Sequence, residues 1–149
     1  MTIHDTHPFL DPESERDPVR RFRGRLGGAV TLWTSGSDDG RAGLTVSSLM
    51  VAGGEPARIL ALLDPDSDLA DAFAGVAPAP GGAFRLAEFE AGECGPTLVD
   101  APAWAAVSLE STQAAGWSSL VSCVVDDVQL GEDTPPLVYR RGHYVRPTD

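Results

Sequence analysis

Three hydroxyl side chains lie close together within Gly43–Leu49, in an apolar, β-branched run. Thr45 and Ser47 alternate along this run, so a strand would place them on one face, with Ser48 on the other unless the strand bends or ends. Hydroxyls and free backbone N–H groups are neutral donors that suit a phosphate or the polar edge of a planar ring. The ordinary alternative is the exposed polar face of a strand.

A second polar segment, Asp64–Ser67, precedes apolar residues at helical spacing. The pattern predicts a short helix over 67–75, with Asp66 or Ser67 as its N-cap. The free N–H groups at a helix N-terminus can hold an anion. The four aspartates between 64 and 71 allow another interpretation, in which they only cap the helix and complement its dipole.

Positive charge is unevenly placed in this chain of 149 residues, which has 22 acidic and 11 basic residues and a net charge of -11. All the basic residues are arginine; five lie within 16–25 and three within 140–146, whereas only Arg58 and Arg85 lie within 42–139. Both ends could supply positive charge to one anionic ligand or acidic partner, or they could simply be solvated. The acidic balance argues against binding to nucleic acid or to an anionic membrane.

Several kinds of chemistry lack suitable residues. His4, His7 and His143 are too few and too scattered for a catalytic triad, and no cysteine–histidine spacing predicts a metal site. Cys94 and Cys123 occur without an export signal or a membrane-spanning apolar run, which predicts a reduced, cytoplasmic protein. Abundant Ala, Gly and Arg with no Lys or Asn indicate a GC-rich bacterial genome.

Short apolar runs separated by turn signals indicate a single domain over 14–146 that follows a disordered lead-in at 1–13. A helix is expected within 14–23, near Pro18, in addition to the one over 67–75. The rest predicts an antiparallel β-barrel or sandwich of six or seven strands. The expected strands cover 26–34, 42–51, 58–63, 83–89, 104–110 and 120–128, and the segments 137–139 and 143–145 close the chain around Gly142.

Three stretches, Gly27–Thr34, Gly40–Leu62 and Gly131–Tyr144, resemble in order and spacing the flavin reductase-like family of short-chain flavin reductases. The resemblance implies a mainly β fold: an antiparallel split β-barrel of six to seven strands with one or two short helices. It also implies an FMN-binding (or FAD-binding) oxidoreductase that uses NAD(P)H as co-substrate. Such proteins are usually homodimers, and some serve a monooxygenase partner.

The resemblance also assigns residues to the cofactor. The flavin-contacting stretch of the family corresponds to Thr45, Val46, Ser47 and Ser48; the serine that reaches the phosphate corresponds to Ser67; and the strand alongside the flavin corresponds to Ala83 and Phe84. Because the middle of the chain is acidic, we expect Arg23 or Arg25, or Arg140 or Arg141, near the flavin phosphate in the dimer.

One departure from the family keeps other functions open. Where the family commonly has Gly-Asp-His, with a histidine linked to nicotinamide binding, this chain has Gly116-Trp117-Ser118. Trp117 could stack where a nicotinamide would lie, or it could be a packed structural residue. The alternatives to an enzyme are therefore a non-catalytic module that binds flavin or another planar cofactor, and a dimeric interaction protein with an empty site.

Overall fold

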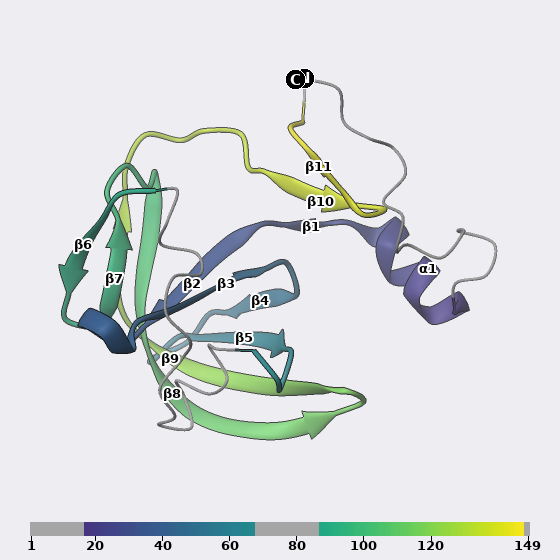
Figure 1. Ribbon diagram of the computed structural model, residues 1–149, viewed down its shortest axis with the longest axis horizontal. Helices are drawn as coiled ribbons and strands as arrows, with labels where there is room; N and C mark the ends of the chain where they lie inside the picture. Colours follow the sequence, from purple (N-terminus) through teal and green to yellow (C-terminus); the bar gives the residue numbers. More distant parts are fainter. Residues whose placement is uncertain (1–16, 68–86, 148–149) are drawn as a thin grey trace.

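The computed structural model describes residues 17–67 and 87–147, which form one α-helix and eleven strands (Figure 1). The predicted fold class, mainly β with antiparallel strands, is confirmed, although the strands are more numerous and several are shorter than expected. No helix in the described ranges is long and apolar enough to cross a membrane. The expected lead-in 1–13, nearly all of the helix over 67–75, and residues 83–86 of the expected strand lie outside the described residues.

A four-stranded sheet in the order β4-β5-β9-β8 is the largest sheet of the described chain. All its neighbouring strands are antiparallel, and β8 and β9 are 13 residues each, longer than the runs expected at 104–110 and 120–128. The strands of this sheet are β4 Leu49–Ala52, β5 Arg58–Leu63, β8 Ala103–Ala115 and β9 Ser118–Leu130.

The apolar core lies on one face of this sheet, because alternate residues of β5 and β9 point to the same side. Leu63 is 1% exposed and Cys123 is fully buried. The cluster consists of Val46, Ala61, Leu63, Val121 and Cys123, with Trp33, Leu44, Leu49 and Val107 packed against it. Val46 and Leu44 come from β3 Ala42–Val46, which pairs with β2 Thr31–Ser35.

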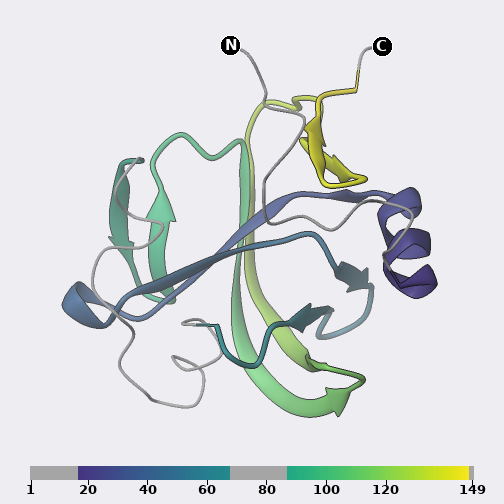
Figure 2. The same ribbon diagram turned by 45° about the vertical axis from the view of Figure 1, so that its right-hand side comes forward.

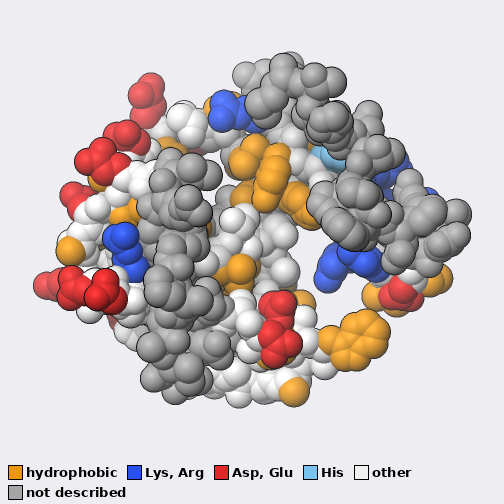
Figure 3. Space-filling model, viewed as in Figure 1, with side chains coloured by type: hydrophobic (Ala, Val, Ile, Leu, Met, Phe, Trp, Pro, Cys, Tyr) orange, Lys and Arg blue, Asp and Glu red, His pale blue; other side chains and the backbone are white. Residues whose placement is uncertain are grey.

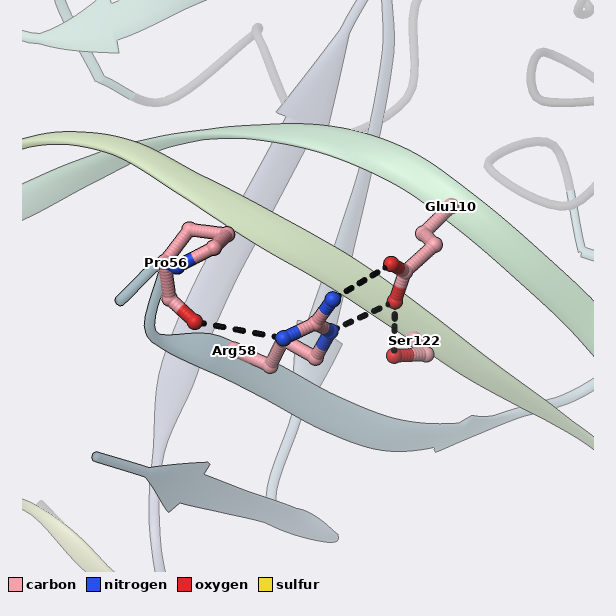
Figure 4. A network of polar contacts seen from close by, with 4 residues as sticks. All are labelled: Pro56, Arg58, Glu110 and Ser122. Atoms are coloured by element: carbon pink, nitrogen blue, oxygen red, sulfur yellow. Dashed lines mark hydrogen bonds and ion pairs between the residues drawn. The ribbon is translucent and has the colours of Figure 1, made fainter. Parts of the chain in front are cut away.

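The opposite face of the sheet carries an ion pair that a β-bulge puts in place (Figure 4). In β8, Leu109 lies opposite Cys123 and Ser111 opposite Ser122, so Glu110 is the extra residue of the bulge. Arg58 donates from Nε and Nη2 to the two Glu110 carboxylate oxygens, at 2.7 Å each. The bonds from Arg58 lower the pKa of Glu110, and the same contact raises the pKa of Arg58.

Two strands expected to be continuous are interrupted. The run 42–51 breaks after Val46, and β4 begins only at Leu49. The expected strand 26–34 starts with the end of a helix and then divides into β1 Gly28–Ala29 and β2. The first break leaves Ser47 and Ser48 in a connection between sheets, where neither residue belongs to a strand ladder.

The two ends of the described chain form a unit that we call the terminal arm: α1, β1, β10 and β11. Helix α1 spans Pro18–Leu26: it begins at Pro18, as the sequence allowed, where Asp17 caps the N–H of Val19, and it ends three residues beyond the expected 23. Strand β1 pairs with β10 Val138–Arg140, which pairs with β11 His143–Val145. Figures 1 and 2 show the arm extending away from the four-stranded sheet.

A small hairpin completes the described chain. Strands β6 Phe89–Gly92 and β7 Gly95–Leu98 are joined by a two-residue turn, where the sequence indicated only a turn. Strand β7 lies against β2, since the Thr34 hydroxyl donates to the Pro96 carbonyl oxygen and a Cβ built on Gly95 would lie 3.1 Å from the Ser35 Cα. A 3₁₀ turn at Asp38–Gly40 lies between β2 and β3.

Candidate functional site

The predicted residues Ser47 and Ser48 lie between β3 and β4, at one end of the four-stranded sheet. Ser48 is exposed and Ser47 is half-buried. The Ser48 carbonyl oxygen accepts a hydrogen bond from the Leu62 N–H at 3.0 Å, which fixes this connection beside the C-terminal end of β5. Neither hydroxyl has a hydrogen-bond partner among the described residues.

The connection is held from the other side by the terminal arm. A Cβ built on Gly28 of β1 would lie 2.6 Å from the Ser47 carbonyl oxygen, a distance that real Cβ contacts essentially never show. Only glycine allows β1 to approach this closely. Gly28 also pairs with Tyr139 of β10, so the strand that contacts the connection belongs to the β1–β10–β11 sheet. The arm therefore borders the Ser47–Ser48 connection within one chain.

The arm joins the two arginine-rich ends of the sequence. The Arg141 N–H donates to the Gly24 carbonyl oxygen at 2.9 Å, which fixes the β10–β11 turn against α1. Arg23 and Arg25 lie in the last turn of α1, and Arg140 ends β10; all are exposed. This arrangement favours the interpretation in which both ends supply positive charge to one place, although Arg23 and Arg25 also complement the helix dipole.

Negative charge lies on the opposite side of the molecule. Figure 3 shows arginine side chains beside α1 and several acidic side chains over β6 and the 38–40 turn, at the far side of the view. The acidic residues of those two segments are Asp38, Asp39 and Glu90, with Glu93 in the turn that follows β6. The arginines of the arm thus lie apart from this acidic cluster, while Asp64 and Asp66 follow β5 at the end of the sheet where the Ser47–Ser48 connection lies, and Arg41 follows the 38–40 turn.

Ser67 lies at the same end of the sheet, a few residues after β5 ends. Its hydroxyl donates to the Asp64 carbonyl oxygen at 2.7 Å, and its N–H donates to the same oxygen at 3.1 Å. The Asp64 carboxylate accepts from the Asp66 N–H at 2.9 Å. The hydroxyl proton of Ser67 is thus engaged, and it would have to turn away from Asp64 to donate to a phosphate oxygen.

The other predicted cofactor residues differ in their accessibility. Thr45 is exposed, on the face of β3 opposite the core. Val46 is 3% exposed, and its carbonyl oxygen accepts from the Thr31 hydroxyl at 2.7 Å. The side chain of Val46 therefore supports the core and has no free surface for a ligand. Ala83 and Phe84 lie outside the described residues.

Trp117 occupies the turn of the β8–β9 hairpin and is 96% exposed. Ala115 pairs with Ser118, so Gly116 and Trp117 form a two-residue turn, and Gly116 has φ 58°. A positive φ at the first turn position is typical of the type II′ hairpin turn. Within a single copy of the chain, the interpretation of Trp117 as a packed structural residue is therefore wrong.

A separate cleft of about 870 Å³ opens between β2, the β6–β7 hairpin and the ends of β8 and β9. Among the described residues, Thr45 lines this cleft, whereas Ser47, Ser48 and Ser67 do not. Cys94 reaches it from the β6–β7 turn and is exposed, unlike Cys123 in the core, where burial raises the pKa of the thiol.

Neutral hydroxyls and the arginine side chains of the arm are groups that suit a phosphorylated planar ligand. The sequence matches the model of the flavin reductase like domain over residues 64–148, more than half of the chain. The chain belongs to this family. Membership supports the predicted flavin-binding, NAD(P)H-dependent reductase and does not favour the non-catalytic module.

Solved structures share the fold at low sequence identity. The NADH:FAD oxidoreductase SgcE6 of Streptomyces globisporus is 17% identical, with a TM-score of 0.78 over 93% of this chain and 96% of that one. The styrene monooxygenase flavin reductase of Pseudomonas putida S12 is also 17% identical, with a TM-score of 0.71 over 89% and 98%. The flavin reductase HpaC, solved with NADP+, gives 18% and 0.72 over 87% and 96%. No curated protein matches the sequence significantly.

The sequence interpretation missed the role of Gly28. Two adjacent glycines in an apolar β run are a signal for close backbone approach, and Gly27–Gly28 carries that signal here. What the sequence did not indicate is the group approached, the Ser47 carbonyl oxygen, because the contact joins residues 19 positions apart through a break in the strand.

Proposed function

We propose that this protein is an FMN-dependent flavin reductase whose flavin lies at the end of the four-stranded sheet, along Thr45, Ser47 and Ser48. The observation that carries the proposal is the contact of Gly28 with Ser47 in a member of the flavin reductase family. It brings an arginine-bearing arm beside two hydroxyls that have no hydrogen-bond partner among the described residues. The hydroxyls suit the ring edge and ribityl chain, and the arginines suit the dianionic phosphate.

In this proposal, the flavin supplies the redox chemistry when bound, since it can accept a hydride from reduced nicotinamide. The residues of the chain bind and orient the two ring systems. Arg23, Arg25, Arg140 and Arg141 are the candidates for the phosphate, and Ser67 joins them if its hydroxyl turns from Asp64. Ala83 and Phe84 are assigned to the ring face. Their assignment rests on the family resemblance alone.

A homodimer is part of the same proposal. Val19, Phe22 and Leu26 follow one face of α1, at i, i+3 and i+7, and are 72%, 64% and 67% exposed. A helix of nine residues with no buried side chain gains little stability by itself. A second copy that covers this stripe would stabilise the arm and enclose the flavin. We also propose that the protein works in a bacterial cytoplasm and supplies reduced flavin to a monooxygenase partner.

The test is the absorbance spectrum of the purified protein, followed by titration with FMN and, separately, FAD. FMN should bind in the micromolar range or tighter, and NADH or NADPH oxidation should depend on added flavin. Replacing both Ser47 and Ser48 by Ala should weaken binding about tenfold, as expected for the loss of one or two hydrogen bonds. Ser111→Ala, at an exposed position of β8, is the control. FMN fluorescence that stays unchanged at tens of micromolar protein would disprove the proposal.

A further inference from the structure

The side chain of Arg21, on α1, contains a buried donor that has nothing to donate to. Its Nε is the one side-chain nitrogen or oxygen atom in the described ranges that is buried and lacks a hydrogen-bond partner. Nearly all buried polar groups in proteins are paired, and an exception calls for a physical reason. Burying a charged N–H group without an acceptor costs free energy, which an anion bound at this position would recover.

The helix face that carries Arg21 points toward the rest of the arm. Within α1, Arg21 and Gly24 are half-buried and the other residues are exposed. The Gly24 carbonyl oxygen accepts from the Arg141 N–H, so Arg21 lies on the same face, one helical turn before this contact. Figure 3 shows arginine side chains on the side of α1 that faces the rest of the molecule. Arg21 therefore differs from the exposed arginines of the same helix.

The arm itself offers these arginines no acidic side chain. Residues 18–29 and 138–145 contain six arginines and no aspartate or glutamate. None of the six forms an ion pair in the part of the chain that the structure describes. In a chain with a net charge of -11, such a concentration of unpaired positive charge attracts anions. A dianionic group held among the guanidinium groups would also reduce the repulsion between them.

The contacts of the arm connect Arg21 to the proposed flavin site. The Ser47 carbonyl oxygen touches β1 at Gly28, and the β10 residue that pairs with Gly28 lies two positions, about 7 Å of strand, before Arg141. Arg141 bonds to Gly24, which follows Arg21 by about 4.5 Å along the helix axis. The ribityl chain separates the phosphate of a flavin from its ring, so ring and phosphate can occupy the two ends of this path.

We propose that Arg21 binds the phosphate of the flavin, with Nε–H and one terminal N–H group donating to two phosphate oxygens. This assignment rests on the proposed function, because the flavin that carries the phosphate is the one held along Ser47 and Ser48. A guanidinium presents its N–H groups in a fixed plane that matches two oxygens of a phosphate. The exposed side chains of Arg23 and Arg25 add positive charge, whereas the half-buried side chain of Arg21 is held in place before the phosphate arrives.

The binding test replaces Arg21 by Met, which keeps an apolar stem and removes the guanidinium. The FMN dissociation constant should rise roughly tenfold or more, whereas that of riboflavin, which lacks the phosphate, should change less than about twofold. Arg20→Met makes the same change of charge at the exposed neighbouring position, and it should stay within about threefold of the wild type. Equal FMN affinities in the two Met variants would overturn the proposal.

The stability of the ligand-free protein separates a binding arginine from a structural one. A structural arginine loses stabilising contacts on replacement, whereas a donor buried without an acceptor is a cost that Met removes. We therefore expect Arg21→Met to unfold at the same urea concentration as the wild type or at a higher one. A lower midpoint combined with unchanged FMN affinity would make Arg21 a structural residue and contradict the proposal.

Arg21→Lys guards against a folding defect in the Met variant, because it keeps the charge and lacks the Nε–H group. Its FMN affinity should lie between those of the wild type and Arg21→Met. Wild-type affinity in Arg21→Lys, measured together with wild-type affinity in Arg21→Met, would show that the guanidinium does not touch the phosphate.

Inorganic phosphate tests the same position without flavin. Compared with sodium chloride at equal ionic strength, it should raise the unfolding temperature of the wild type and of Arg20→Met, but not of Arg21→Met. If the wild type binds no FMN, the proposed function fails, although phosphate protection that requires Arg21 would still assign the anion to this residue. If FMN binds equally to both Met variants, only the assignment of Arg21 fails. A raised KM for NADH or NADPH in Arg21→Met, with unchanged FMN affinity, would move the phosphate to the coenzyme and overturn the proposal.

Discussion

Gly28 and Ser47 are in backbone contact, and this contact sets the position of the proposed flavin-binding connection. The carbonyl oxygen of Ser47 occupies the space in which any other residue at position 28 would place its Cβ, 2.6 Å away. Because the obstructing atom belongs to the backbone, it cannot move aside by a rotamer change. The conformation of the Ser47–Ser48 connection therefore depends on a residue of the terminal arm.

Gly28→Ala should displace Ser47 and weaken flavin binding without removing any polar group. We expect the clash to cost about 1–3 kcal/mol in stability, as for an overpacked core position. The FMN dissociation constant should rise about tenfold. Fluorescence titration and urea unfolding measure the two effects. Gly53→Ala is the matched control, since a Cβ there meets nothing within 4 Å. Equal stability and equal FMN affinity in the two variants would show that the structure accommodates a Cβ at position 28.

Arg140→Ala and Arg141→Ala, and the same change at Arg23 and Arg25, test the source of positive charge. At least one of the four should weaken FMN binding about tenfold, the loss of one charge-assisted hydrogen bond. It should affect riboflavin, which lacks the phosphate, much less. Arg41→Ala, in the turn before β3, is the control. If all four variants bind FMN as the wild type does, the phosphate is held by other groups.

The Arg58–Glu110 pair should make stability depend on pH in the acidic range. The pKa of Glu110 is lowered in the folded protein, so its contribution is complete above the ordinary carboxyl pKa and is lost as the pH falls through the lowered folded value. Glu110→Gln should be less stable than the wild type near pH 7, and the difference should shrink toward pH 3. Urea unfolding at several pH values measures this effect. Glu93→Gln, in the exposed β6–β7 turn, is the matched control.

The two cysteines should differ sharply in reactivity. Cys94 is exposed, whereas Cys123 is fully buried and its pKa is raised, so little reactive thiolate is present. A chromogenic disulfide reagent should modify one thiol per chain quickly in the folded protein and both after denaturation. In Cys94→Ser, the fast reaction should disappear. Two fast thiols in the folded wild type would mean that β9 opens readily.

Leu63→Ala should destabilise the chain by about 2–5 kcal/mol, because it leaves a cavity in the core beside Val121 and Cys123. Met50→Ala, at a β4 position that is 66% exposed, should cost far less. Thermal or urea unfolding measures both. Comparable losses in the two variants would indicate that another surface covers Met50, as a second copy of the chain would do.

The sequence predicted the elements whose pattern is local and left out those that depend on contacts between distant segments. The alternation in 104–110 and the apolar run 120–128 predicted the β8 and β9 strands, and the segments around Gly142 predicted the closing β10 and β11 strands. The strand ends were predicted less well, because polar positions such as Ser118 and Gln129 extend the ladder only through their pairing partners.

The candidate site shows the same division. The hydroxyls of Thr45, Ser47 and Ser48 could be singled out by type and spacing, whereas Val46 was assigned to the flavin by the family resemblance alone. The Val46 side chain is buried in the core because β3 packs onto β5 and β9. The sequence allowed the two basic ends to lie together only as one of two interpretations, because their proximity depends on the hydrogen bond from the Arg141 N–H to the Gly24 carbonyl oxygen.

The separation of charge in the described chain bears on how fast an anionic nucleotide can arrive. Most of the surface of a protein with a net charge of -11 repels such a molecule, and the arm offers the attractive direction. Long-range attraction toward one patch guides diffusing anions, and repulsion elsewhere lowers the share of unproductive collisions. Because salt at physiological concentration limits this attraction to about 8 Å, the association rate of FMN should fall as ionic strength rises, while the rate of dissociation changes little.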